Sequence, residues 1–256
     1  MSGTLYLVPN TLDFGVATES GTAGPPDLQQ VLPLGVIRIA ARLPCWVAEN
    51  AKTTRAFLKR VHAVVPLSQP LQAIVIVELP RANKGAPQEP AVKLDALLAP
   101  ALAGQDIGLI SEAGLPAVAD PGAALVQAAH SLNVRVEALS GPSSLMLALA
   151  ASGLNGQSFA FVGYLPVEAA ARQARIRELE ALSRKSQQTQ LMIETPYRNA
   201  ALLQALLSVL AGSTRLSVSC GLTLDLGWSR TDTVAGWKAV PATVPADTPS
   251  VFSLLA

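Results

Sequence analysis

Cysteine, histidine and charged residues are scarce in this sequence of 256 residues. Its two cysteines, Cys45 and Cys220, lie far apart and form no CxxC pair, and it has two histidines. Protein zinc sites gather these residue types at short spacing, so we expect no metal site. Two isolated cysteines fit a reducing, cytoplasmic compartment, where disulfides are rare.

Long apolar runs and several common catalytic signatures are also missing. The apolar runs are broken by Gly, Pro or charge well short of the roughly 20 residues that a membrane span requires. The first residues lack a basic stretch followed by an apolar core, so we expect neither a membrane span nor a signal peptide. The sequence has no GxGxxG, Walker loop, GxSxG or HExxH. Nucleotide hydrolysis, serine hydrolysis and zinc proteolysis are therefore disfavoured.

What the sequence has is enough apolar material for a substantial core. Half of its residues are hydrophobic, 14% are charged, and the formal net charge is +1. Global disorder is excluded by this composition, and the length allows one large or two small domains. Because the whole chain is nearly neutral, contact with nucleic acid would need a local basic patch.

Apolar β-type segments alternate with helical patterns in the first half of the chain. The expected strands are Leu5–Val8, Cys45–Glu49, Leu71–Leu79, Ile107–Ser111 and Val134–Leu139. The expected helices are Asp27–Arg42, Ala51–His62, Ala91–Ala103 and Ala123–Ser131, with Pro33 starting or kinking the first. This alternation predicts an α/β fold with a parallel sheet covered by helices on both faces.

The pattern of expected elements changes in the second half of the chain, where strands outnumber helices. The expected strands are Phe159–Val162, Gln190–Glu194, Leu216–Cys220, Thr231–Ala235 and Ser250–Leu255. They indicate a second, mixed-sheet α/β lobe, and we place the boundary between residues 1–116 and 117–256. A ligand is expected in a cleft between the lobes.

Small-residue loops follow the expected parallel strands. They are Pro9–Gly15, Glu49–Thr54, Ser111–Gly122 and Ser140–Ser144. Ligands of open α/β sheets bind at this edge, and small residues let the backbone approach them. Taken alone, any one of these loops is better explained as an ordinary turn, and it is their number at one edge that favours a ligand site.

Several motifs resemble the ribosomal RNA small-subunit 2′-O-ribose methyltransferase I family. SEAGLPAVADPG (Ser111–Gly122), SGPSSLMLALAASG (Ser140–Gly153) and FAFVGYLP (Phe159–Pro166) are similar to its SDAGTPxxxDPG, PGPxAxxxALxxSG and FxFxGFLP. LYLVPN, WVAENAKTT (Trp46–Thr54) and IETPYRN (Ile193–Asn199) resemble further family segments in the same order. The resemblance covers nearly the whole chain.

This resemblance implies a two-lobed class III methyltransferase fold, a homodimer and S-adenosyl-L-methionine as cofactor. By position, the cofactor residues would be Leu12, Ala113, Gly114, Leu115, Val118, Ser143, Ser144, Glu194 and Leu222. The start of the helix after Ser143 offers free N–H groups for a carboxylate such as that of the cofactor. Helix capping by Ser143 and lobe packing by Leu222 are the structural alternatives.

The sequence departs from the family pattern mainly at polar positions. The first loop, Asn10–Gly15, reads NTLDFG where the family has TPIGNLxD. Leu115 replaces a threonine, Asn50 and Lys52 replace an aspartate and an arginine, and Cys220-Gly221 replaces an Arg-Glu pair. The departures leave two alternatives open: a same-fold methyltransferase acting on a tetrapyrrole or other small molecule, and a non-catalytic cofactor- or RNA-binding paralogue.

Carboxylates and one basic run are the candidates for chemistry and substrate contact. Glu49, Glu112, Asp120 and Glu194 fall at expected strand ends, and we predict catalytic roles for Glu49 and Glu194 because both lie in matched motifs. RNA contact is predicted through the basic run Arg172, Arg175, Arg177, Arg184 and Lys185. A solvated helix face balanced by Glu178 and Glu180 explains that run equally well.

Overall fold

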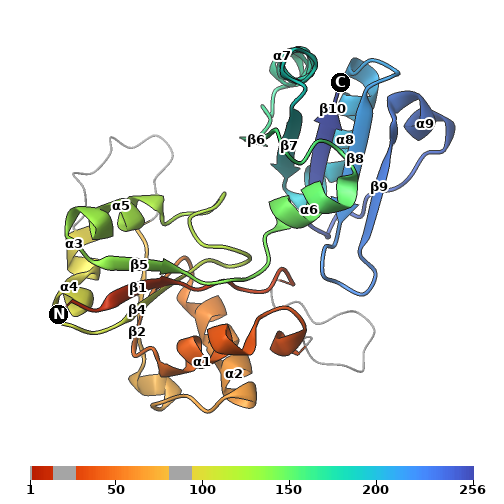
Figure 1. Ribbon diagram of the computed structural model, residues 1–256. Helices are drawn as coiled ribbons and strands as arrows, with labels where there is room; N and C mark the ends of the chain where they lie inside the picture. Colours follow the sequence, from red (N-terminus) through yellow and green to blue (C-terminus); the bar gives the residue numbers. More distant parts are fainter. Residues whose placement is uncertain (1, 14–26, 81–93) are drawn as a thin grey trace. The chain divides into compact units, whose positions relative to one another are not determined.

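The structure is a computed structural model that describes residues 2–13, 27–80 and 94–256. The chain divides into two compact units, Met1–Pro142 and Ser143–Ala256 (Figure 1). This division comes later than the boundary expected after residue 116. The strand β5 (Arg135–Ala138) pairs with β1 (Thr4–Leu7), so the chain up to Pro142 belongs with the first sheet.

The first unit contains a parallel sheet of five strands in the order β3-β2-β4-β1-β5. The remaining strands are β2 (Cys45–Ala48), β3 (Val75–Glu78) and β4 (Ile107–Ile110). All four strand pairs of this sheet are parallel, as the sequence predicted. Their carboxyl ends therefore meet at one edge, where the small-residue loops begin.

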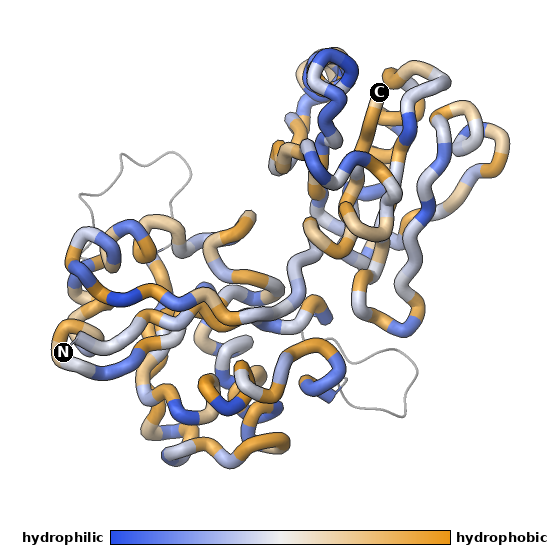
Figure 2. Tube along the Cα trace, viewed as in Figure 1, coloured by the Kyte–Doolittle hydropathy of each residue, from blue (hydrophilic) through white to orange (hydrophobic). Residues whose placement is uncertain are grey.

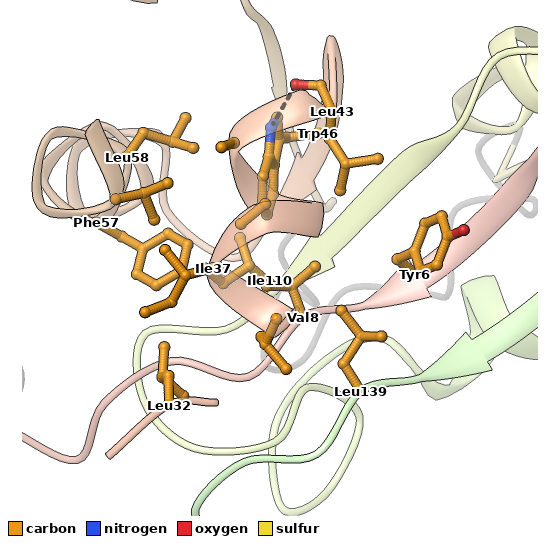
Figure 3. Packing of buried hydrophobic residues seen from close by; sticks show 14 of the residues in the cluster. Tyr6, Val8, Leu32, Ile37, Leu43, Trp46, Phe57, Leu58, Ile110 and Leu139 are labelled. Atoms are coloured by element: carbon orange, nitrogen blue, oxygen red, sulfur yellow. Dashed lines mark hydrogen bonds between the residues drawn. The ribbon is translucent and has the colours of Figure 1, made fainter. Parts of the chain in front are cut away.

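Helices cover both faces of this sheet. On one face, α1 (Leu34–Arg42) and α2 (Ala51–Val64) pack on a cluster that includes Trp46 (Figure 3). The indole N–H of Trp46 donates to the carbonyl of Leu43 at 3.3 Å, which satisfies its polar atom inside the core. On the other face lie α3 (Leu94–Leu97), α4 (Ala99–Leu102) and α5 (Ala123–Ser131), whose cluster includes Val47. Successive residues of β2 thus serve opposite faces.

The first unit differs from the expected elements at three places, and proline explains two of them. The expected helix Asp27–Arg42 is a 3₁₀ turn, η1 (Leu28–Gln30), followed by α1, which begins directly after Pro33. The expected strand Leu71–Leu79 begins with a 3₁₀ turn, η2 (Leu71–Ala73), and becomes β3 at Val75. The expected helix Ala91–Ala103 is broken into α3 and α4, with Pro100 in the first turn of α4. Proline has no backbone N–H to donate within a helix and is tolerated in the first turn, so a helix is interrupted before it. Residues 91–93 lie outside the described ranges.

The second unit contains a mixed sheet in the order β6-β7-β10-β8-β9. β6 and β7 are parallel, and the other three pairs are antiparallel. The strands are β6 (Phe159–Tyr164), β7 (Thr189–Glu194), β8 (Arg215–Cys220), β9 (Trp228–Thr233) and β10 (Ser250–Leu255). This is the mixed α/β lobe that the sequence predicted.

Helices also cover both faces of the second sheet. They are α6 (Ser144–Ser152), α7 (Ala169–Ser186), α8 (Asn199–Val209) and α9 (Val234–Ala239). α7, α8 and α9 share a cluster with Phe252, whereas α6 packs on Leu191 and Val251 from the opposite face. α7 is largely hydrophilic along its length (Figure 2).

Candidate functional site

The loops after β1 and β4 are joined through Asn10. Its backbone N–H donates to the carbonyl of Gly114 at 2.9 Å. Its side-chain amide donates to the carbonyls of Ser111, at 3.2 Å, and Glu112, at 2.9 Å. Asn10 is buried, so these bonds are shielded from water and fix the two loops against each other. The structure thereby brings together Leu12 and Gly114, two residues expected to contact the cofactor.

Glycine allows the loop backbones to approach closely at this edge. Gly114 has a φ of +66°, a conformation that favours glycine, and a Cβ there would lie 3.3 Å from Cδ2 of Leu12. A Cβ on Gly141 would lie 2.3 Å from Cβ of Pro9. The edge is therefore built from backbone and small residues. The other predicted residues of the central loop differ in exposure: Ala113 and Leu115 are half-buried, whereas Val118 is exposed.

Three carboxylates lie at the same edge. The backbone N–H of Glu112 donates to Oε2 of Glu49 at 3.0 Å, which links the loop after β4 to the end of β2. The pKa of Asp120 is raised from 3.8 to about 7, first by burial and then by the charges of Glu49 and Glu112. A carboxyl group with such a pKa can accept or release a proton near neutral pH. Asp120 therefore has a physical property that sequence position alone did not assign to it.

A buried ion pair holds the first loop, and the sequence did not reveal it. Nη2 of Arg60 lies 2.9 Å from Oδ2 of Asp13, and Nη1 donates to the hydroxyl of Thr11 at 3.1 Å. The Asp13 side chain is 5% exposed and that of Arg60 is 15% exposed. Arg60 follows buried Phe57 by three residues on α2, a spacing that could have indicated that it faces inward.

Ser111 adds a polar atom without a partner to this edge. Its side chain is buried at the end of β4, and its hydroxyl has no hydrogen-bond partner within the part of the chain that the structure describes. A buried polar group left unpaired costs about 1–3 kcal/mol. The sequence analysis placed Ser111 at the start of the central loop but gave it no role.

The remaining expected cofactor residues belong to the second unit. Ser143 precedes α6 as its N-cap in an extended conformation, and the described residues show no capping hydrogen bond from its side chain. Ser144 begins the helix. Leu222 is partly buried against the cluster of Leu145 and Leu191.

Glu194 is buried at the end of β7 and bound through both carboxylate oxygens. Oε1 accepts from the backbone N–H of Thr195 at 2.8 Å, and Oε2 lies 2.7 Å from Nη2 of Arg198. These contacts hold the 3₁₀ turn η3 (Pro196–Arg198) against the strand. The predicted catalytic role of Glu194 stays a prediction.

The departure at Cys220-Gly221 has a structural explanation. Cys220 is buried in the core of the second unit, where burial raises the pKa of its thiol. Gly221 has a φ of +61°, and a Cβ there would lie 3.1 Å from Cγ2 of Thr248. A charged Arg-Glu pair therefore does not fit this backbone and burial.

The predicted basic run lies on α7 and is partly compensated. Arg175 pairs with Glu178 at 2.6 Å, and Nη1 of Arg172 donates to the carbonyl of Val167. The other three basic residues, Arg177, Arg184 and Lys185, are exposed.

Within residues 2–13, 27–80 and 94–256, no helix is long and apolar enough to cross a membrane. No group of three or more His, Cys, Asp or Glu in the same ranges is arranged to hold a metal ion.

Known protein sequences are similar to this chain. The sequence profile of the family Tetrapyrrole (Corrin/Porphyrin) Methylases matches residues 30–234. The Vibrio cholerae protein named Ribosomal RNA small subunit methyltransferase I is 37% identical to this chain over 131 residues, which are 51% of this chain and 44% of that protein. The Mesorhizobium japonicum protein of the same name is 38% identical over 138 residues, which are 54% of this chain and 46% of that protein. In Escherichia coli O157:H7 the protein of that name is 30% identical over 185 residues (64% and 63%). The chain spans about half the length of the curated relatives it matches.

Solved structures show the same fold at low identity. Two crystal structures of uroporphyrin-III C-methyltransferase from Thermus thermophilus are 18% identical, with TM-scores of 0.51 and 0.54. The matches cover 100% and 99% of this chain and 93% and 97% of those chains. With the two sheets described above, they confirm the predicted class III methyltransferase fold.

Proposed function

Because the chain belongs to the tetrapyrrole (corrin/porphyrin) methylase family, we propose that it is an S-adenosylmethionine-dependent methyltransferase acting on a ribose 2′-hydroxyl of ribosomal RNA. The observation that carries the proposal is the glycine-built edge where Asn10 joins the loop of Gly114. Relatives named Ribosomal RNA small subunit methyltransferase I, at 30–38% identity, support the RNA acceptor. With such an acceptor, we propose that the protein acts in the cytoplasm.

The residues at this edge fit the cofactor. Leu12 offers an apolar wall, and Gly114, which has no side chain, lets the loop backbone lie close to it. Bound S-adenosylmethionine would supply an activated methyl group. The proposed cofactor residues are Leu12, Ala113, Gly114, Leu115 and Val118 in the first unit, and Ser143, Ser144, Glu194 and Leu222 in the second.

The chain's own residues would act by positioning and proton transfer. Glu49 holds the backbone of Glu112 and so orders the central loop. We propose that Asp120 accepts the proton of the acceptor hydroxyl. Its pKa of about 7 suits a general base at neutral pH. Positioning by such an ordered loop contributes up to roughly 7–11 kcal/mol in favourable cases, and a general base roughly 10²–10⁴-fold in rate.

A homodimer remains part of the proposal. The second unit exposes apolar side chains on α6 and the edge strand β6, including Met146 at 44%, Phe159 at 38% and Phe161 at 37%. Large exposed apolar side chains are common in protein interfaces. Light scattering during gel filtration should give the mass of two chains, and a monomer at micromolar concentration would exclude this part.

Calorimetric titration with S-adenosylmethionine and with S-adenosylhomocysteine tests the proposal. We expect binding of both in the micromolar range, which corresponds to about −8 kcal/mol. A folded protein that binds neither compound would contradict the methyltransferase assignment. Binding without methyl transfer to RNA, but with transfer to a tetrapyrrole, would replace the acceptor and keep the class.

A further inference from the structure

The two helices on one face of the first sheet carry a strong charge asymmetry. Together α1 and α2 contain six basic residues and no Asp or Glu, although the whole chain has a net charge of +1. The six are Arg38, Arg42, Lys52, Arg55, Lys59 and Arg60. Such a local excess creates a positive potential that the average composition conceals.

Most of this charge is not neutralised by carboxylates. Arg42 pairs with Asp106 at 2.6 Å and Arg60 pairs with Asp13 at 2.9 Å. The other four basic residues form no ion pair within the ranges that the structure describes, and all four are exposed. Lys52, Arg55 and Lys59 follow one another at spacings of three and four residues, which places them along one side of α2.

A hollow of about 800 Å³ lies where these helices meet the 3₁₀ turn η1. Its basic lining residues are Arg38 from α1 and Lys59 and Arg60 from α2, and its apolar ones include Leu34 and Val64. Among the described lining residues, Asp27 is the one carboxylate, and it accepts a hydrogen bond from the backbone N–H of Gln29 at 3.0 Å. The hollow therefore combines an excess of cations with apolar surface.

We propose that this hollow and the exposed side of α2 bind the phosphate backbone of an RNA strand. Exposed lysines and arginines bind phosphates by releasing their counterions, and they do not require a particular base sequence. The apolar lining residues of the hollow, which form its apolar rim, offer a surface for the bases or riboses of the same strand. The choice of RNA as the partner rests on the proposed function, whereas the phosphate-binding property rests on the charges of α1 and α2.

This surface is a stronger candidate than the basic run of α7. On α7, Glu178 and Glu180 lie among the basic residues, and Glu178 pairs with Arg175. On α1 and α2 no carboxylate offsets the charge within the helices. Electrostatic attraction of a phosphate backbone should therefore be greater at α2.

The test compares two double variants with the same change in charge. Arg38→Gln/Lys59→Gln removes two cations from the hollow. Arg215→Gln/Lys238→Gln removes one exposed arginine and one exposed lysine from the second unit and serves as the matched control. Fluorescence anisotropy of a short, labelled single-stranded RNA is measured from about 50 to about 200 mM salt. Inorganic phosphate and a nucleoside monophosphate are added in separate arms as competitors.

We expect the hollow variant to bind RNA roughly tenfold more weakly at low salt, with a salt slope shallower by about 1.4. The control should keep the wild-type slope. Competition by the nucleoside monophosphate at concentrations where inorganic phosphate has no effect would support contact of the apolar rim with base or ribose. Equal slopes for wild type and hollow variant, equal losses in both variants, or no RNA binding by the wild type would each overturn the inference.

The same proteins separate this inference from the proposed function. Cofactor titration of the hollow variant should match wild type, because neither substituted residue lies at the edge around Gly114. If the wild type bound RNA with the expected charge dependence but did not bind S-adenosylmethionine, the proposed function alone would fail.

Discussion

Replacing Asp120 with asparagine should remove a pH dependence from the stability of the protein. In the folded chain the pKa of this carboxyl is about 7, against an ordinary value of 3.8. Between these values the folded state holds a proton that the unfolded state has released, so the free energy of unfolding falls as pH rises. Each pKa unit corresponds to about 1.36 kcal/mol, which sets an upper bound of about 4 kcal/mol. Asp120 is only half-buried, so we expect about 2 kcal/mol after solvent screening.

Urea unfolding followed by circular dichroism from about pH 4 to about pH 8 measures this effect. The wild type should lose stability relative to Asp120→Asn as pH rises to about 7, and the difference should then stay constant. The exposed Asp225→Asn serves as the control and should follow the wild type. Parallel curves for wild type and Asp120→Asn, or a carboxyl pKa near 4 by carbon NMR, would refute the reasoning.

Three further substitutions test the edge and its support. Gly114→Ala should weaken S-adenosylmethionine binding about tenfold in calorimetry, since a Cβ there would lie 3.3 Å from a leucine methyl group. Asp13→Asn removes the negative charge from a pair whose side chains are 5% and 15% exposed, so the free energy of unfolding should fall by about 3–5 kcal/mol in urea. Gly108→Ala places a Cβ 2.6 Å from an indole ring and should cost about 1–3 kcal/mol in the same assay.

Each of these three has its own control or contrary result. Gly153→Ala has the same left-handed backbone, with a φ of +63°, but its Cβ would meet nothing within 4 Å, so cofactor binding should be unchanged. Equal effects at both glycines would indicate backbone strain alone. A loss below about 1 kcal/mol for Asp13→Asn would show that the pair behaves as a surface ion pair. A fully stable Gly108→Ala would show that the first core can rearrange around Trp46.

The elements that the sequence predicted correctly are those whose signal is local. The alternation of β-rich runs with helices predicted the parallel sheet, because each buried strand carries its own apolar pattern. Local proline also explains two of the differences, after Pro33 and within α4. The extent of Leu71–Leu79 was wrong because an apolar run does not distinguish a 3₁₀ turn from a strand.

The site was less predictable because it depends on pairings between distant residues. Asp13 and Arg60 are far apart in sequence, and no sequence motif indicates that they pair. The raised pKa of Asp120 arises first from its burial and then from the charges of Glu49 and Glu112, and only the folded chain supplies both. The sequence shows that α1 and α2 contain no Asp or Glu. Only the structure shows that their basic residues line a common hollow.

Transfer of radiolabelled methyl groups from S-adenosylmethionine to small ribosomal subunits tests the central claim most directly. Subunits from a strain that lacks the corresponding ribose methylation provide an unmodified acceptor. We predict incorporation into the RNA at a position that becomes resistant to alkaline cleavage. In that cleavage the 2′-hydroxyl attacks the adjacent phosphodiester, and a methyl group on its oxygen prevents the attack. A protein that binds the cofactor but leaves this RNA unlabelled would contradict the assignment of ribosomal RNA as its acceptor.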